Sequence, residues 1–196
     1  MISAIEQRVR HYWTLRSHDF GVVRKNELDN DMGQRWLREL EMLLPKKNGL
    51  RILDVGTGTG FFAILLSEAG HQVEGIDLTP AMLDEARGVT AQRGLDIVFR
   101  EMDAQALSYD DSSFDVLLSR NLTWTLPEPE KAYREWFRVL KPGVMEQRRR
   151  RRREDARHAE DDQAEIEAND RPVIPVDARH ERLAEVAERD QLEQIL

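Results

Sequence analysis

The segment that most constrains the fold is ILDVGTGTGFF at residues 52–62, where a short apolar run ends in three glycines spaced two residues apart. Residues 50–55 are typical of a buried strand, and the apolar stretch 61–69 is typical of a buried helix. Glycine permits the positive φ angles of a tight turn and a close approach of the backbone to a ligand. Free amide groups at the start of the following helix attract anionic ligand groups. The segment therefore predicts a strand, a ligand-binding loop and a helix.

Strand and helix patterns continue to alternate after this unit. Apolar runs predict further strands at residues 73–76, 97–99 and 114–119. Helices are expected between them over residues 80–92, with Thr79 as N-cap and Pro80 at the first helical position, and over residues 128–140. Such alternation predicts an α/β fold, a Rossmann-like doubly wound parallel sheet with strand order 3-2-1-4.

The chain is expected to have three parts. Apolar residues at helical spacing predict two N-terminal helices, over residues 2–15 and 36–44, in a helical cap of residues 1–49. A ligand-binding domain follows over residues 50–143. Residues 144–196 begin with an abrupt change, because residues 146–170 hold 7 arginines and 9 acidic residues and only one apolar side chain larger than alanine. That segment is expected to be a charged helix or disordered, outside the sheet.

Composition excludes several classes of function. The chain has 29 basic and 37 acidic residues, for a net charge of -8, so its overall field would repel nucleic acid. No stretch approaches 18 consecutive apolar residues, and charges interrupt the N-terminus, so neither a membrane partner nor secretion is expected. The absence of cysteine fits a cytoplasmic location, and the five histidines show no metal-ligand spacing, so no metal is expected.

An acidic residue follows the second predicted strand. Asp77 lies 17 residues beyond Gly60, where a carboxylate can accept two hydrogen bonds from a ribose diol. Phe61 and Phe62 stand where a dinucleotide-binding fingerprint would carry its next glycine, which disfavours a nicotinamide dinucleotide. Two plainer explanations stay open: the glycines could form an ordinary strand-to-helix turn, and Asp77 could cap the turn at Thr79.

With these residues in place, the chain resembles the class I S-adenosylmethionine-dependent methyltransferases, in particular the small-molecule group related to quinone-biosynthesis methyltransferases. The resemblance covers roughly residues 50 to 143. It rests on four blocks in the expected order and spacing: ILDVGTGTG, GIDLTPAMLDEAR, FREMDAQAL, and FDVLLSRN followed by EWFRVLKPG. The resemblance implies S-adenosylmethionine as cofactor and a small-molecule methyl acceptor as partner.

The resemblance also implies a role for individual residues. Those lining the methionine part of the cofactor would be Asp54, Gly56, Gly58 and Gly60. The ribose hydroxyls would be held by Asp77, with Leu78 and Met82 near the sugar or the adenine. The adenine would be flanked by Met102, Asp103 and Ala104. The end of the fourth strand, beside the transferable methyl group, would be formed by Arg120, Asn121 and Leu122.

Catalysis in such an enzyme would need alignment more than acid–base chemistry, since the methyl group moves by in-line displacement. Asn121 and Tyr12 are the residues expected to orient the acceptor. Tyr12, Trp13 and Trp124 could form an aromatic lid, although aromatic residues at helical spacing also pack in cores. Asp103 could likewise be an ordinary loop carboxylate, and Leu78 and Met82 could be helix-packing residues.

The C-terminal part departs from the family pattern. Members follow the LKPG block with a further glycine, an apolar fifth strand and a hairpin that completes a seven-stranded sheet. Here residues 144–147 lead into six arginines, as a truncation or a translated frameshift would produce. The sheet is then expected to be incomplete, with an unpaired edge at its fourth strand, and a homodimer could pair through it. The alternative function is an inactive methyltransferase-like binding or interaction module.

Overall fold

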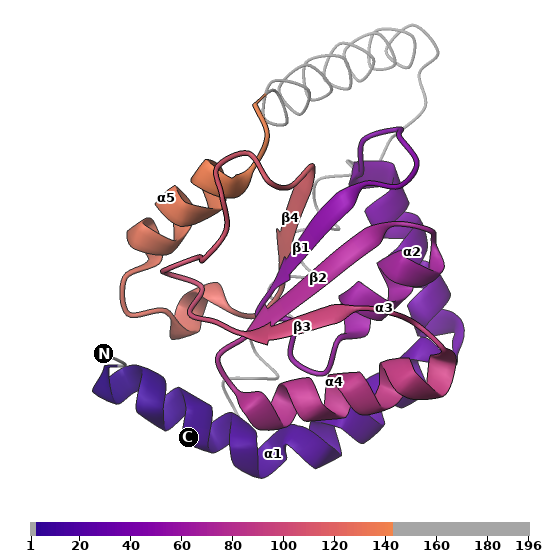
Figure 1. Ribbon diagram of the computed structural model, residues 1–196. Coiled ribbons are helices and arrows are strands. Elements are labelled where there is room, and N and C mark those ends of the chain that lie inside the picture. The colour runs from indigo at the N-terminus through magenta and orange to yellow at the C-terminus, as the bar shows by residue number, and fades with distance from the viewer. Residues whose placement is uncertain (1–2, 143–196) are drawn as a thin grey trace, which may run out of the picture. The chain divides into compact units, whose positions relative to one another are not determined.

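Four short parallel strands form the centre of the fold in a computed structural model that describes residues 3–142 (Figure 1). In chain order they are β1 (Arg51–Val55), β2 (Gln72–Asp77), β3 (Val98–Glu101) and β4 (Val116–Ser119). Their order in the sheet is β3-β2-β1-β4, which confirms the predicted parallel sheet and its strand order. All four strands therefore end at the same edge of the sheet, where open α/β sheets bind ligands.

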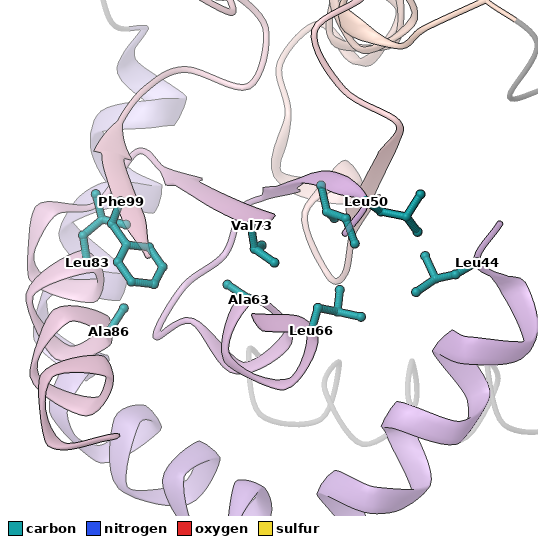
Figure 2. Packing of buried hydrophobic residues seen from close by; sticks show 9 residues of the cluster. Leu44, Leu50, Ala63, Leu66, Val73, Leu83, Ala86 and Phe99 are labelled. Carbon is teal, nitrogen blue, oxygen red and sulfur yellow. The ribbon is translucent and has the colours of Figure 1, made fainter. Parts of the chain in front are cut away.

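Helices cover both faces of the sheet. The face with Ile52 and Val73 packs against α2 (Asp31–Leu43), α3 (Phe61–Glu68) and α4 (Pro80–Arg93), around the buried residues that Figure 2 shows. The opposite face, with Leu53 and Val55, packs against α5 (Pro129–Val139). Side chains alternate across a strand, so the continuous apolar run of β1 supplies both core clusters.

The N-terminal helix is longer than the sequence pattern predicted. It is α1 (Ala4–Leu28), which begins with a capping box between Ser3 and Glu6 and lies alongside α4 (Figure 1). Lys25 Nζ donates to Gln92 Oε1 at 2.7 Å across this contact. The expectation that the helix ends near residue 15 was wrong, because polar residues of its second half pack on α4 and carry no apolar periodicity.

The start of α4 follows the sequence prediction in position but not in its capping bond. Thr79 is the N-cap and Pro80 opens the helix, yet the Thr79 side chain makes no capping hydrogen bond. The Asp77 carboxylate accepts from the Thr79 N–H at 2.8 Å. Asp77 therefore orders this turn.

After α5 the chain returns alongside the start of β4. Phe114 and Leu140 form a parallel bridge, with Phe114 N–H donating to the Val139 carbonyl and Lys141 N–H donating to the Phe114 carbonyl, each at 2.9 Å. The expectations for residues 144–196 lie outside the described residues. The predicted boundary between a helical cap of residues 1–49 and a ligand-binding domain that begins at residue 50 stays a prediction.

Candidate functional site

The glycine loop lies across the carboxyl ends of β1 and β2. The N–H groups of Gly56 and Thr57 both donate to the Ile76 carbonyl at 2.9 Å, and Gly60 N–H donates to the Thr57 carbonyl at 2.9 Å. These bonds tie the loop to the neighbouring strand and turn it into α3. A ligand over this loop would also lie over the end of β2.

The three glycines have different surroundings. All have positive φ, so an ordinary turn already explains their identity. A Cβ at Gly56 would lie 3.0 Å from the Leu122 side chain, and one at Gly60 would lie 3.1 Å from Ala86 and Phe99. A Cβ at Gly58 would meet only the Phe20 ring, at 3.8 Å. Close packing therefore adds to the turn requirement at Gly56 and Gly60, and Gly58 is the glycine with space beside it.

Asp54, near the end of β1, anchors the glycine loop through hydrogen bonds. Its side chain is only 2% exposed, and its Oδ2 accepts from the Thr57 hydroxyl at 2.6 Å. It also accepts from the Ala63 N–H in the first turn of α3, whose N-cap Gly60 has no side chain to offer. Burial raises the pKa of Asp54 to about 7, against these hydrogen bonds. The contact with the methionine part of a cofactor stays a prediction, and the observed role is to order the loop.

Asp77 lies at the end of β2 beside the loop. Its Oδ2 accepts from Gly58 N–H at 2.9 Å and its Oδ1 from Thr79 N–H at 2.8 Å. Burial raises the pKa of Asp77, and the hydrogen bonds from Thr79 and Gly58 oppose that rise. A carboxylate oxygen has more than one acceptor site, so each oxygen can take a further hydrogen bond. Asp77 can thus order the turn and accept from a diol at once.

A buried hydroxyl lies in the same loop. Thr59 is 3% exposed, and its Oγ1 has no hydrogen-bond partner among the described residues. An unsatisfied buried hydroxyl costs about 1–3 kcal/mol. The loop therefore carries a polar group whose hydrogen-bonding capacity the rest of residues 3–142 does not use.

The segment after β3 lies beside Asp77. Met102 N–H donates to the Asp77 carbonyl at 3.1 Å, which ties the two segments together. Ala104 is buried, and its carbonyl accepts from Trp136 Nε1 at 2.9 Å. Asp103 is half-buried, and its Oδ1 accepts from Gln105 N–H at 2.8 Å. The bond from Gln105 fits the ordinary loop-carboxylate explanation, and an adenine contact stays a prediction.

Leu78, in the β2–α4 connection, and Met82, in the first turn of α4, differ in burial. Leu78 is half-buried, whereas Met82 is 3% exposed, as expected for a helix-packing residue. Their expected positions near a sugar or an adenine stay predictions.

The sequence did not predict the hydrogen bonds that join α1 to the segment after β3. Gln105 is buried, and its Nε2 donates to Glu6 Oε1 at 2.7 Å, while its Oε1 accepts from Glu128 N–H at 2.8 Å. Nearby, Arg10 pairs with Glu101 at 2.8 Å. The block FREMDAQAL contains Gln105, but no sequence pattern connects it with a glutamate 99 residues earlier.

The residues expected to orient an acceptor lie on two separate elements. Asn121 follows β4, is exposed and has a φ of 56°. Tyr12, on α1, is half-buried and packs edge-on against Trp13 at 5.1 Å, and Trp13 packs against Phe20 at 5.4 Å. Through Phe20 this aromatic chain reaches the glycine loop. Trp124 is 60% exposed, and no ring contact within residues 3–142 joins it to Tyr12 or Trp13.

Arg120, the residue after β4, turns toward α2 and α3. Its guanidinium carbon lies 4.5 Å from the Trp36 ring centre and 5.5 Å from that of Phe62. Burial lowers the pKa of Arg120, and the positive charge of Arg24 lowers it further. The expected position of Arg120 beside a transferred group stays a prediction.

Within residues 3–142, no group of three or more histidine, aspartate or glutamate side chains could hold a metal ion. No helix in that part of the chain is long and apolar enough to cross a membrane.

Comparisons with known proteins agree with the geometry of the loop. A family model described as a methyltransferase domain matches residues 53–145. A demethylmenaquinone methyltransferase of Thermus thermophilus is 41% identical over 111 residues, which cover 56% of this chain and 50% of the relative. The Deinococcus radiodurans protein of the same name is 44% identical over 95 residues, covering 47% and 39%. This chain thus spans half or less of the length of both relatives.

A solved structure supports the fold. The crystal structure of the [4+2]-cyclase SpnF superposes with a TM-score of 0.53 at 32% identity, covering 55% of this chain and 41% of that one. That protein is named as a cyclase, so a shared fold does not by itself define the reaction.

Proposed function

We propose that this chain is a class I S-adenosylmethionine-dependent methyltransferase that transfers a methyl group to a small-molecule acceptor, on the basis of the methyltransferase-domain match at residues 53–145 and of the relatives at 41% and 44% identity. The observation that carries the proposal is the joint geometry of the glycine loop and Asp77. Gly58 donates its N–H to that carboxylate, so the loop and the acid form one surface at the carboxyl ends of β1 and β2. Ligands of open α/β sheets bind at this edge.

The residues present fit the cofactor. Asp77 has an unused acceptor site on each oxygen for the two ribose hydroxyls, and Gly58 leaves space beside the loop. The remaining residues proposed to hold the cofactor are Asp54, Gly56, Gly60, Leu78, Met82, Met102, Asp103 and Ala104, with Arg120 beside its transferable methyl group. When bound, the cofactor supplies an electrophilic methyl group on a sulfonium centre.

The part played by the chain is to bind, align and exclude water. Asn121 and Tyr12 are proposed to orient the acceptor, Asn121 through its amide and Tyr12 through its hydroxyl. The chain of Tyr12, Trp13 and Phe20 would keep water from the glycine loop. Alignment of reacting groups can supply about 7–11 kcal/mol of barrier reduction, so no dedicated general base is required.

Two further features belong to the proposal. The first is a homodimer through the edge of β4, which is the outer strand of the sheet within residues 3–142 and is preceded by Phe114, the partner of Leu140 in a bridge. Light scattering of the full chain tests it, and a monomer at all concentrations would contradict it. The second is a cytoplasmic location, which rests on the absence of cysteine, with no nucleic-acid partner because of the acidic charge balance and no membrane partner because no stretch approaches 18 consecutive apolar residues.

The deciding experiment has two stages. S-adenosylmethionine is first titrated into the full chain by calorimetry, and release of S-adenosylhomocysteine is then assayed with mixtures of small metabolites. Binding followed by product release is the expected result. Binding without product in every mixture would favour the inactive binding module, and no binding would contradict both functions.

A further inference from the structure

A half-buried arginine at the end of β4 has aromatic neighbours but no bonded acceptor. The Arg120 guanidinium lies over Trp36 and Phe62, and it makes no hydrogen bond or ion pair with any residue in the described range 3–142. A guanidinium has five N–H donors in a planar fork. Stacking covers the faces of that plane and leaves the donors at its edge available for an acceptor.

A second arginine approaches from α1. The guanidinium carbon of Arg24 lies 4.8 Å from the Phe20 ring centre and 5.8 Å from that of Phe61. Its side chain is 14% exposed and pairs with Glu27. Arg24 repels Arg120, and Glu27 partly offsets that repulsion. Within residues 3–142, two cations therefore share one carboxylate, which leaves one positive charge in an aromatic setting without a counter-charge in that part of the chain.

This charge lies next to the proposed methyl-transfer site. Arg120 directly follows Ser119, which pairs with Val55 at the end of β1, where the glycine loop begins. On the other side, the Arg24 guanidinium lies over the Phe20 ring, and the same ring lies 3.8 Å from where a Cβ of Gly58 would be. Arg120 is thus next to the residue that pairs with the end of β1, and Arg24 is separated from the glycine loop by the Phe20 ring.

We propose that Arg120, assisted by Arg24, binds the carboxylate of the methyl acceptor, so that the substrate is a monoanionic small molecule. This inference rests on the proposed function, because it takes the ligand of this surface to be the acceptor. Arginine matches a carboxylate in a planar, two-bond geometry. A carboxylate also balances the single excess charge, whereas a phosphate dianion would exceed it.

The test uses benzoate as the anionic probe and benzamide as its neutral counterpart. Each is titrated into the full chain, with and without S-adenosylhomocysteine, and the side-chain Nε–H signal of Arg120 is followed by NMR. We expect benzoate to bind at least tenfold more tightly than benzamide and to shift that signal, which the Arg120→Gln variant identifies by its loss.

The variants separate charge from hydrogen-bond geometry. Arg120→Gln should weaken benzoate binding at least tenfold, followed on the benzoate resonances, and Arg120→Lys should fall between the two. Arg24→Gln should weaken binding by a smaller factor. The matched control is Arg51→Gln, because Arg51 also lies over a phenylalanine ring, Phe114, but at the amino end of β1. It should bind benzoate as the unmodified chain does.

Several results would overturn the proposal. They are equal affinity for benzoate and benzamide, no measurable benzoate binding, unchanged binding by Arg120→Gln, or tighter binding of phenyl phosphate than of benzoate. Failure of the proposed function looks different: S-adenosylhomocysteine does not bind while benzoate still does, which would retain the anion site but overturn its assignment to a methyl acceptor.

Discussion

The central strand and the edge strand of the sheet carry different kinds of site residues. In β1, residues 52–55 are all buried, and the loop after the strand is tied to β2 and anchored by Asp54. In β4 all four residues are half-buried, and the strand leads into the stacked Arg120 and the exposed Asn121. On the β1 side, Asp54 and Asp77 accept hydrogen bonds from other described residues. On the β4 side, the N–H donors of Arg120 make no hydrogen bond within residues 3–142.

This difference suggests a division of labour. A site for an invariant cofactor gains from a rigid, buried support, because preorganised groups lose little freedom on binding. A site that selects one acceptor gains from side chains whose charge is left unmatched until the right ligand arrives. The β1 side fits the first requirement and the β4 side the second.

The sharpest test of the comparison uses two leucines that pair across the strands. Leu53 in β1 and Leu117 in β4 are partners in register and contribute to the same core cluster. Leu53→Ala should lower the free energy of unfolding by about 3 kcal/mol, because the residue is fully buried. Leu117→Ala should lower it by about 1 kcal/mol, since the side chain is only partly removed from water. Urea unfolding measures both, and equal losses would remove the contrast between the strands.

The second prediction concerns pH and the support below the loop. The pKa of Asp54 is about 7 in the folded chain, against a usual value of 3.8. Between these values the folded state holds a proton that the unfolded state has released, so stability falls as pH rises and levels off above about pH 7. Relative to Asp54→Asn, the unmodified chain should lose on the order of 2 kcal/mol between about pH 5 and pH 8.

Urea unfolding of both proteins across this range provides the measurement. The comparison with Asp54→Asn cancels the contributions of titrating groups that do not interact with Asp54, and the charge of Asp77, which raises the pKa of Asp54, is part of the measured effect. A constant difference between the two proteins would show that Asp54 does not change protonation near neutrality.

The third prediction addresses the cofactor directly. Asp77→Ala should weaken binding of S-adenosylhomocysteine by about 1.5–3 kcal/mol, the scale of hydrogen bonds to a charged group. Calorimetry measures the change, and Asp84→Ala provides a control, because Asp84 is an exposed acid on the first part of α4. An unchanged dissociation constant for Asp77→Ala would leave Asp77 with the turn at Thr79 as its only role.

Local sequence patterns predicted the β1 side well. The glycine series, the apolar runs and the alternation of elements depend on neighbours close in the chain, so the strand order and the position of Asp77 followed from them. The burial of Asp54 was not predicted, because it depends on the Thr57 hydroxyl and the start of α3 folding back over the strand.

The β4 side could not be predicted in the same way. Arg120, Arg24 and Trp36 come from the end of a strand and from two different helices, and no periodicity links their positions. The second half of α1, which carries Phe20 and Arg24, was not expected to be helical at all. Only the tertiary fold brings these residues together, so the excess positive charge was invisible in a chain with net charge -8.

The smallest effect distinguishes an arginine that binds a ligand from one that holds the fold. Arg120→Gln removes cation–π contacts with Trp36 and Phe62 but also relieves the repulsion from Arg24, so stability should change by less than about 1 kcal/mol. Arg51→Gln removes a ring contact, an ion pair with Glu74 at 3.2 Å and a bond to the Ser113 carbonyl. Its loss should be larger, at about 1–2 kcal/mol, because nothing offsets it. Thermal or urea unfolding ranks the two, and a greater loss for Arg120→Gln would make Arg120 a structural residue of the α2–α3 face.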